Sequence, residues 1–225
     1  MRVKTEERRQ AIIERAGEVF REVGFERASM SEIAARVGGS KATLYSYFKS
    51  KEELFVAVMK VSTEISTVFN PFADPTQPKI SSFDELRETL VTFGLRYVTL
   101  QLAPNPLAVR SSLIAHGDQS DLGKIVFESG PMQNYMLVAT FLGRMMQEGY
   151  LRQEVPWVAL GHFFHLLESG LVLPRLLGLF KTVTPEMINE AVPRSVEVFL
   201  RGYGMPEHLG LAKPKREGAR KAEVG

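Results

Sequence analysis

Residues 29–48 read SMSEIAARVGGSKATLYSYF, two short segments on either side of a glycine pair. Ser29 stands three residues before Glu32, the spacing of a capping box, which predicts the start of a short helix. Gly38-Gly39 ends that helix, and Ser40 is placed to cap a second one of similar length. Two short helices joined by a tight turn that contains glycine indicate a helix-turn-helix, a motif that binds DNA.

The chain on both sides of this stretch also has helical patterns. Apolar residues recur at three- and four-residue spacing over 5–23, which predicts one amphipathic helix, and Gly24 follows where such a helix would end. Ser50 is placed to cap a fourth helix. We therefore expect a three-helix DNA-binding domain over 1–50, linked to the rest of the chain through a helix over 51–69.

A proline-rich segment over 70–78 separates this domain from a longer apolar region. Glycine and proline divide that region into helices expected at 82–102, 105–116, 120–148, 155–180 and 184–202. Almost no segment shows the alternation of apolar and polar residues that is typical of a strand. The sequence thus predicts an all-α protein: the small head, a larger C-terminal helical bundle over 70–205 for ligand binding and dimerisation, and a flexible basic tail over 206–225.

The overall composition excludes several classes of protein. Hydrophobic residues make up 44% and charged residues 24% of the chain, which suits an ordinary globular protein, and the absence of cysteine excludes disulfides and thiolate metal sites. Charges within the first dozen residues argue against a signal peptide, and charged and polar residues interrupt the apolar stretch 158–180, so we expect no membrane span. A cytoplasmic location is expected.

The charges are unevenly distributed along the chain. Residues 1–60 hold 12 Lys and Arg against 9 Asp and Glu, residues 61–212 hold 11 against 15, and residues 213–225 hold 5 against 2. A basic head on an acidic body suits a protein that meets DNA phosphates at one end.

The segment from Ile12 to Leu54 resembles the TetR family of transcriptional repressors. The resemblance rests on residues at matching spacings: Ala16, Phe20, Gly24, Phe25, Ile33, Ala34, Gly38, Ser40, Thr43, Leu44, Tyr45, Phe48, Lys51, Glu52, Glu53 and Leu54. It implies an all-helical C-terminal domain for ligand binding and dimerisation. The stretch from Pro106 to Leu177 is more weakly similar to the AefR-type branch of these regulators.

Two positions depart from the family pattern. The family usually has a Thr-Thr pair where this chain has Ala28-Ser29, and Ser29 keeps the capping hydroxyl. A valine or isoleucine is usual where this chain has Gly39. The glycine removes a side chain from the turn, so we expect a looser turn. The position of the reading helix can then be inferred less closely from other members of the family.

The second helix of the motif must hold a core with one face and enter the major groove with its first turn. Leu44 and Phe48 are expected to face inward. Matched by position to the family, the residues expected to meet base edges are Lys41, Ala42, Tyr45 and Ser46. Those expected to contact phosphates are Thr43, Tyr47 and Lys51. Ser29, Ser31 and Ser40 are expected at helix N-termini that can bind phosphate, with Ser29 and Ser40 as caps first and phosphate contacts second.

An apolar cavity in the C-terminal domain is expected to hold the effector. The residues expected to line it are Phe93, Tyr97, Leu113, Tyr135, Met136 and Phe163 or Phe164, with Arg110 and His116 as polar groups. The alternatives are that the apolar residues are plain bundle core and that Arg110 makes a structural ion pair.

Neither a metal site nor catalysis has positive support. His162 and His165 lie on one helix face, and a site with His116, Asp118 and Asp121 would need the two segments to converge. No pattern of a known catalytic site is present, so we expect no cofactor and no enzyme activity.

The function predicted from the sequence is repression by a homodimer bound to a palindromic double-stranded operator and released by a small, mostly apolar molecule. The apolar helices at about 157–202 are expected to form the dimer surface, and two-fold symmetry would set the reading helices about 34 Å apart. Three alternatives stay open: an activator or DNA-organising factor without an inducer, a helical enzyme using His116, His162 or Glu168, and a membrane-surface protein using the basic tail.

Overall fold

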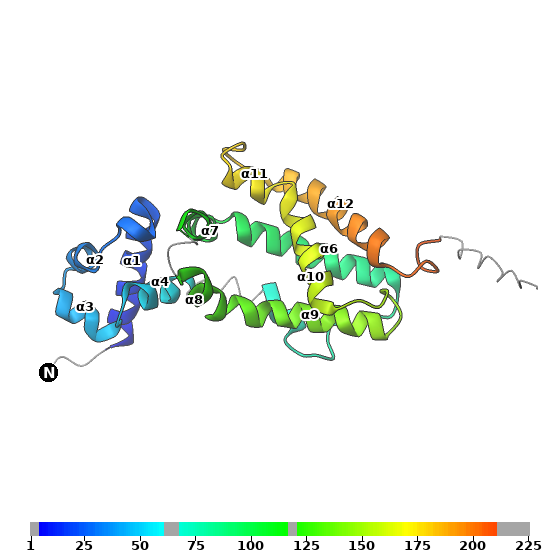
Figure 1. Cartoon of the computed structure of the whole chain (residues 1–225), viewed down its shortest axis with the longest axis horizontal. Helices are drawn as coiled ribbons and strands as arrows, with labels where there is room; N and C mark the ends of the chain where they lie inside the picture. The colour runs from blue at the N-terminus through cyan, green and yellow to red at the C-terminus, as the bar shows by residue number, and fades with distance from the viewer. Residues whose placement is uncertain (1–4, 61–67, 117–120, 211–225) are drawn as a thin grey trace, which may run out of the picture.

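The computed structural model describes residues 5–60, 68–116 and 121–210. Apart from one isolated antiparallel bridge between Leu151 and Gly204, the regular elements in these ranges are helices, as predicted. A small head of four helices lies at one end of an elongated molecule and a larger helical body fills the rest (Figure 1). No helix among the described residues is long and apolar enough to span a membrane.

The head consists of α1 (Glu6–Arg27), α2 (Met30–Val37), α3 (Lys41–Tyr47) and α4 (Lys51–Lys60). Ser29, Ser40 and Ser50 each accept a hydrogen bond from the backbone amide three residues ahead, so the predicted caps are confirmed. The backbone leaves the helical conformation at Gly24, where φ is +80°, and a short turn then completes α1.

The inner faces of these helices form the core of the head. Leu44 and Phe48, predicted to face inward, are 2% and 1% exposed. Phe20 and Phe25 pack against Phe55 of α4 with ring centroids 5.0 and 4.8 Å away, in edge-to-face arrangements. The motif therefore rests on a hydrophobic core that all four helices share, with an aromatic cluster from α1 and α4 inside it.

The body begins with a short 3₁₀ turn, η1 (Asn70–Phe72), and contains seven helices within the described residues. They are α6 (Phe83–Leu102), α7 (Pro104–His116), α8 (Leu122–Glu128), α9 (Pro131–Gln147), α10 (Pro156–Ser169), α11 (Val172–Leu176) and α12 (Pro185–Tyr203). Helices α6, α9, α10 and α12 enclose the main core (Figure 1).

Two of the predicted helices are interrupted. The helix expected over 120–148 is two helices, α8 and α9, because Gly130 is not helical and Pro131 starts a new first turn. The helix expected over 155–180 ends at Ser169. A helix that continued through Pro174 would lack the hydrogen bond to the carbonyl of Gly170, and the proline ring would clash with that carbonyl. The chain therefore breaks at Gly170 and Leu171 and restarts as α11, with Pro174 in its first turn. The part of the predicted 51–69 helix over residues 61–67 lies outside the described residues.

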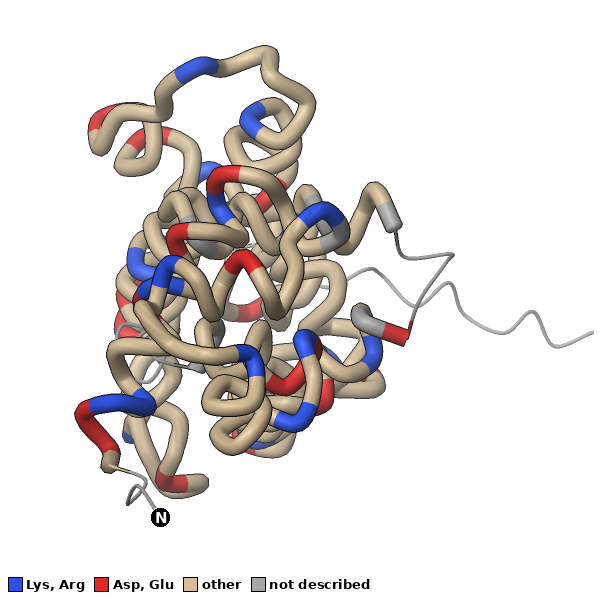
Figure 2. Tube along the Cα trace, turned by 90° about the vertical axis from the view of Figure 1, so that its left-hand side faces the viewer, with Lys and Arg blue, Asp and Glu red and all other residues tan. Residues whose placement is uncertain are grey.

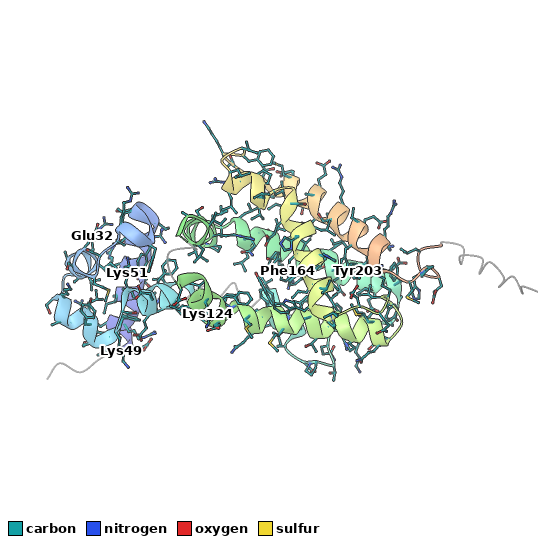
Figure 3. The ribbon with its side chains drawn as sticks, viewed as in Figure 1. Glu32, Lys49, Lys51, Lys124, Phe164 and Tyr203 are labelled. Carbon is teal, nitrogen blue, oxygen red and sulfur yellow. The ribbon has the colours of Figure 1, made fainter. Side chains whose placement is uncertain are left out.

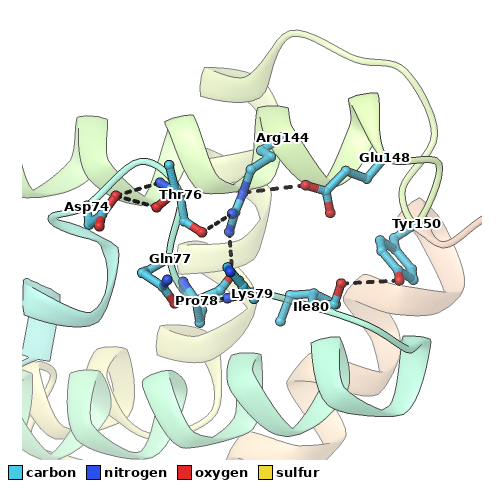
Figure 4. A network of polar contacts seen from close by, with 9 residues as sticks. All are labelled: Asp74, Thr76, Gln77, Pro78, Lys79, Ile80, Arg144, Glu148 and Tyr150. Atoms are coloured by element: carbon cyan, nitrogen blue, oxygen red, sulfur yellow. Dashed lines mark hydrogen bonds and ion pairs between the residues drawn. The ribbon is translucent and has the colours of Figure 1, made fainter.

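The proline-rich segment between head and body is held by one arginine of α9. Arg144 donates from Nη1 to the carbonyl of Thr76 at 2.7 Å and from Nη2 to the carbonyl of Pro78 at 2.5 Å (Figure 4). Asp74 accepts from the amide and the hydroxyl of Thr76, which closes the turn locally. Residues 73–80, which follow η1, are therefore an anchored strap along α9.

The head and the body share part of one core. Val109 of α7 is 8% exposed and Val126 of α8 is 5% exposed, and both are buried among head residues, with Leu113 packed beside them. Helix α1 contacts α7 and α4 contacts α8. We call Val109, Leu113 and Val126 the joint, because these body side chains complete the core of the head.

Candidate DNA-binding face and effector cavity

Helix α3 presents one exposed face to solvent. Lys41, Ala42, Tyr45 and Ser46, the residues predicted to meet base edges, are all exposed and lie on the side opposite the buried Leu44. Lys41 Nζ lies 5.9 Å from the centroid of the Tyr45 ring. A short helix that buries one side and leaves its first turn open has the form that entry into a major groove requires.

The residues predicted to contact phosphates surround this face and also hold the head together. The Thr43 hydroxyl lies 2.9 Å from the Ser40 hydroxyl, and the Tyr47 hydroxyl accepts from the amide of Thr5. The Lys51 amine donates to the carbonyl of Phe25 at 2.8 Å and lies 4.1 Å from that ring's centroid.

Two further serines lie at the start of α2. Ser29 is exposed and its hydroxyl caps the helix by accepting from the amide of Glu32, and Ser31 is exposed beside it. The exposed Lys49, which sequence reasoning did not single out, adds a positive charge just after α3 (Figure 3).

The turn between α2 and α3 is tied to α1. Arg8 Nη2 lies 3.3 Å from the carbonyl oxygen of Val37 and 3.4 Å from that of Gly38, and donates to both. A Cβ atom at Gly39 would lie 3.3 Å from the same nitrogen, so the glycine leaves the guanidinium its place. The turn is thus held by a side chain from a distant part of the sequence, contrary to the expectation of a looser turn.

Charges of both signs occur on the head. Viewed onto the head end, Lys and Arg positions are interspersed with Asp and Glu positions (Figure 2). Arg36 pairs with Glu22 at 2.5 Å and lies 3.6 Å from Glu32, so part of the acid is neutralised within the head. Lys41 on the face of α3 and Lys49 just after this helix are both exposed.

The body contains a cavity of about 270 Å³ between α7 and α10. Five helices contribute its lining: Tyr97, Arg110, Phe127, Tyr135, Trp157, Leu160, Gly161, Phe164, His165 and Glu168. Phe164, inside the body (Figure 3), stacks on Tyr97 with centroids 4.5 Å apart, and Tyr135 meets Phe164 edge to face at 4.8 Å. The wall is therefore largely aromatic.

A polar cluster centred on one carboxylate lies in this wall. Glu168, whose side chain is 13% exposed, accepts from Arg110 Nη2 at 2.5 Å and from the Tyr97 hydroxyl at 2.6 Å. Gln101 donates to the Tyr97 hydroxyl at 2.7 Å. Burial raises the pKa of Tyr97 well above its ordinary value and also raises the pKa of Tyr135, so both phenols are neutral donors.

One donor of this cluster is unused. Arg110 Nη1 is shielded from solvent and has no hydrogen-bond partner in the part of the chain that the structure describes. Burial of the guanidinium lowers its pKa, but the hydrogen bond and charge of Glu168 outweigh that effect and the pKa is raised. Arg110 is therefore charged, paired on one nitrogen and unsatisfied on the other.

The structure brings Tyr97, Arg110 and Tyr135 to this cavity and, of the alternatives Phe163 and Phe164, brings Phe164. Phe93 and Phe163 lie behind its wall in the aromatic core, with their centroids 6.1 Å apart.

The remaining predicted effector residues do not reach it. Leu113 packs in the joint. Met136 is 51% exposed and lines a separate hollow of about 580 Å³ beside Pro75 and Trp157. The side chain of His116 lies outside the described residues.

Sequence reasoning did not place Glu168, Phe127 or Trp157 in the effector cavity. Glu168 had a visible signal, since it is the one acidic residue in the apolar stretch 158–180. Its partners, however, are 71 and 58 positions away in the sequence, and only the packing of α6 and α7 against α10 brings them together.

Each histidine of α10 has a hydrogen-bond partner within the protein. His162 Nδ1 lies 2.5 Å from the Tyr203 hydroxyl, and His165 Nδ1 donates to the carbonyl of Gly161 at 2.6 Å. Within the described ranges, no group of three or more His, Cys, Asp and Glu side chains could hold a metal ion, and Asp118 lies outside those ranges.

Comparison with known proteins gives two family matches. Residues 12–58 match the family of bacterial regulatory proteins called tetR, and residues 88–205 match the C-terminal domain of the AefR-like transcriptional repressors.

Two curated relatives are similar over parts of the chain. The transcriptional activator FasR of Mycolicibacterium smegmatis is 46% identical over 59 residues, 26% of this chain and 27% of that protein. The A-factor receptor protein of Streptomyces griseus is 33% identical over 100 residues, 44% of this chain and 34% of that protein. The chain thus spans about a quarter to a third of the length of these relatives.

Solved structures share the fold over nearly the whole chain. A TetR-family regulator from Mesorhizobium loti has a TM-score of 0.74 at 23% identity, covering 90% of this chain and 100% of that one. The flavonoid-responsive regulator FrrA has a TM-score of 0.67 at 28% identity, covering 89% of this chain and 98% of that one.

Proposed function

Because the chain belongs to the TetR family of DNA-binding transcriptional regulators, we propose that it is a repressor released from DNA by a small molecule. It binds a palindromic operator as a homodimer, reads base edges with Lys41, Ala42, Tyr45 and Ser46, and is displaced when a ligand enters the cavity between α7 and α10. The flavonoid-responsive name of FrrA is consistent with a small-molecule signal.

The joint is the observation that carries this proposal. On α7, Val109 is buried in the head core while the next residue, Arg110, lines the cavity. On α8, Val126 is buried in the head core while Phe127 lines the cavity. A ligand that favours another position of these two helices would therefore also change the support of the head. Release requires such a ligand to bind more tightly to the conformation that does not fit DNA than to the one that does.

DNA binding is tested on a fragment selected from a random pool, with affinity measured by fluorescence anisotropy at several salt concentrations. Lys41→Ala and Tyr45→Ala should each weaken binding by about fivefold or more, because a good base contact is worth about 1–3 kcal/mol. Lys124→Ala, an exposed lysine on α8 (Figure 3), is the matched control and should bind like the native chain. Equal affinity and sequence preference in all of these proteins would contradict the assignment.

The proposed dimer surface lies on α10 and α12, which pack on each other. Val158 and Val198, on these two helices, are 40% and 54% exposed. Val198→Glu should place an unpaired charge in the interface and yield monomers by light scattering, with loss of the operator complex. Thr182→Glu, on the exposed loop before α12, is the control. A Val198→Glu protein with the mass of the native assembly would exclude this surface.

Activation is a second candidate, and the match to FasR favours it, because that relative is named an activator and its similarity spans 59 residues. Transcription in vitro from a template carrying the selected site distinguishes the two. A repressor lowers the transcript when its site overlaps the promoter, whereas an activator raises it from an upstream site. A DNA-organising factor would instead bind many weak sites and show no ligand effect.

A further inference from the structure

We propose that the cavity between α7 and α10 binds a compact, planar aromatic molecule by an acceptor oxygen held on Arg110 Nη1. This inference rests on the proposed ligand response and names the class of ligand and the residue that selects it.

The unpaired donor Nη1 of Arg110 favours a ligand that carries an acceptor oxygen. Glu168 occupies Nη2 and neutralises the guanidinium charge, while Nη1 is buried without an acceptor among the described residues. Arg110 lines the cavity, but Nη1 itself is shielded, so a turn of the guanidinium has to bring this nitrogen to a ligand oxygen. A buried donor left unpaired is costly, so that contact gains more than it would gain in water. Because Arg110 is already paired with a carboxylate, a neutral ketone, ester or phenol oxygen is sufficient, and a carboxylate is not required.

The walls select for a flat ring. Tyr97 and Phe164 form a stack whose planes are inclined by 17°, Tyr135 meets Phe164 edge to face, and Phe127 meets Tyr135 edge to face. Aromatic pairs prefer offset-stacked or edge-to-face arrangements, and both geometries are offered to a ring that enters this space. A flexible aliphatic chain would gain only the free energy of burying its apolar surface, and it would lose more conformational freedom on binding.

The volume limits the size of the ligand. At about 270 Å³ the cavity is slightly smaller than the range of about 300–1,000 Å³ in which pockets for drug-sized ligands fall. A fused two-ring compound suits this space better than a long acyl chain.

Three probes separate these features, each titrated calorimetrically into the full chain without DNA. Acetylnaphthalene carries the flat ring and the oxygen, ethylnaphthalene lacks only the oxygen, and methyl decyl ketone has the oxygen and as many carbons on a flexible chain. We expect acetylnaphthalene to bind about tenfold to hundredfold more tightly than ethylnaphthalene, the worth of one hydrogen bond to a charged group. Trp157, the single tryptophan of the chain, lines both this cavity and the hollow beside Pro75, so quenching of its fluorescence reports binding at either place, and the Arg110 variants assign the binding to the cavity.

Arg110→Met should reduce the preference for acetylnaphthalene over ethylnaphthalene to less than about twofold, because the donor is gone. The double variant Arg110→Met with Glu168→Gln leaves no unpaired carboxylate and serves if the single variant does not fold. Arg96→Met, an exposed arginine of α6, should keep the full preference.

Several results would overturn the inference. These are equal binding of the two naphthalenes to the native chain, no binding of either, tighter binding of methyl decyl ketone than of acetylnaphthalene, or a preference that survives both Arg110 variants. Adding operator DNA separates this inference from the proposed function. If acetylnaphthalene binds with the expected pattern but leaves the operator complex intact, the inference stands and ligand release fails. If another compound releases the operator while the naphthalenes bind equally, release stands and the inference fails.

Discussion

Replacing Val109 by alanine removes two methyl-sized groups from a side chain that is 8% exposed in the joint. Each buried methylene is worth about 0.8 kcal/mol, and incomplete collapse of the cavity adds to that loss. We therefore expect the free energy of unfolding to fall by about 2 kcal/mol. A substitution on a body helix should thus destabilise the head, because Val109 is buried among head residues.

Urea unfolding followed by circular dichroism at one fixed protein concentration measures this loss. Ile114→Ala is the matched control, since Ile114 lies on the same helix and is 69% exposed, and its cost should stay below about 0.5 kcal/mol. The second readout is the ratio of the operator affinity without a releasing compound to the affinity with it. This ratio should shrink in Val109→Ala, because a weaker joint couples movement of α7 less tightly to the head. Equal unfolding midpoints for the two variants would refute the shared core, and an unchanged ratio would refute its role in release.

Three further predictions follow from other contacts. Gly39→Val should push aside the guanidinium of Arg8, lose its bonds to two carbonyls and lower the free energy of unfolding by about 1 kcal/mol; a urea midpoint equal to that of the native chain would contradict this. Burial raises the pKa of Tyr97 above its ordinary value of 10.0, so the folded protein favours the neutral phenol. The protein is therefore fully stable with respect to this group below pH 10.0, and it loses stability as the pH rises from there toward the raised pKa. Alkaline unfolding of Tyr97→Phe should therefore show a shallower fall in stability, and identical pH profiles would refute it. Arg144→Met should free the strap over residues 73–80, and limited proteolysis there should be faster than in the native chain; equal cleavage rates would show that other contacts hold it.

The head was largely predictable because its signals are local. The serine caps and the paired glycines each act within a few residues, and the structure has all of these features where the sequence predicts them. The tie between Arg8 and the turn was not predictable, since the donor and its acceptors are 29 and 30 positions apart. Nothing in the local pattern of α1 distinguishes Arg8 from the neighbouring arginine.

The body was predictable as a set of helices and less so in its breaks and its cavity. The apolar pattern continues past Gly170, so periodicity alone extended the helix, although Pro174 carried the physical reason to end it. Residue type suggested Tyr97, Arg110 and Tyr135 for the cavity. Their convergence on Glu168 depends on how four helices cross, which is a property of tertiary packing.

The joint also has a consequence for how such proteins can be recombined. A chimeric regulator made by cutting the chain between the DNA-reading and the ligand-sensing parts would take the head away from Val109 and Val126, whose side chains fill its core. A transplanted head would need matching apolar groups on the recipient's equivalents of α7 and α8, or it would expose a hydrophobic gap. The unit that is exchanged is therefore the head together with one side of two body helices, and the boundary between reading and sensing runs lengthwise along those helices.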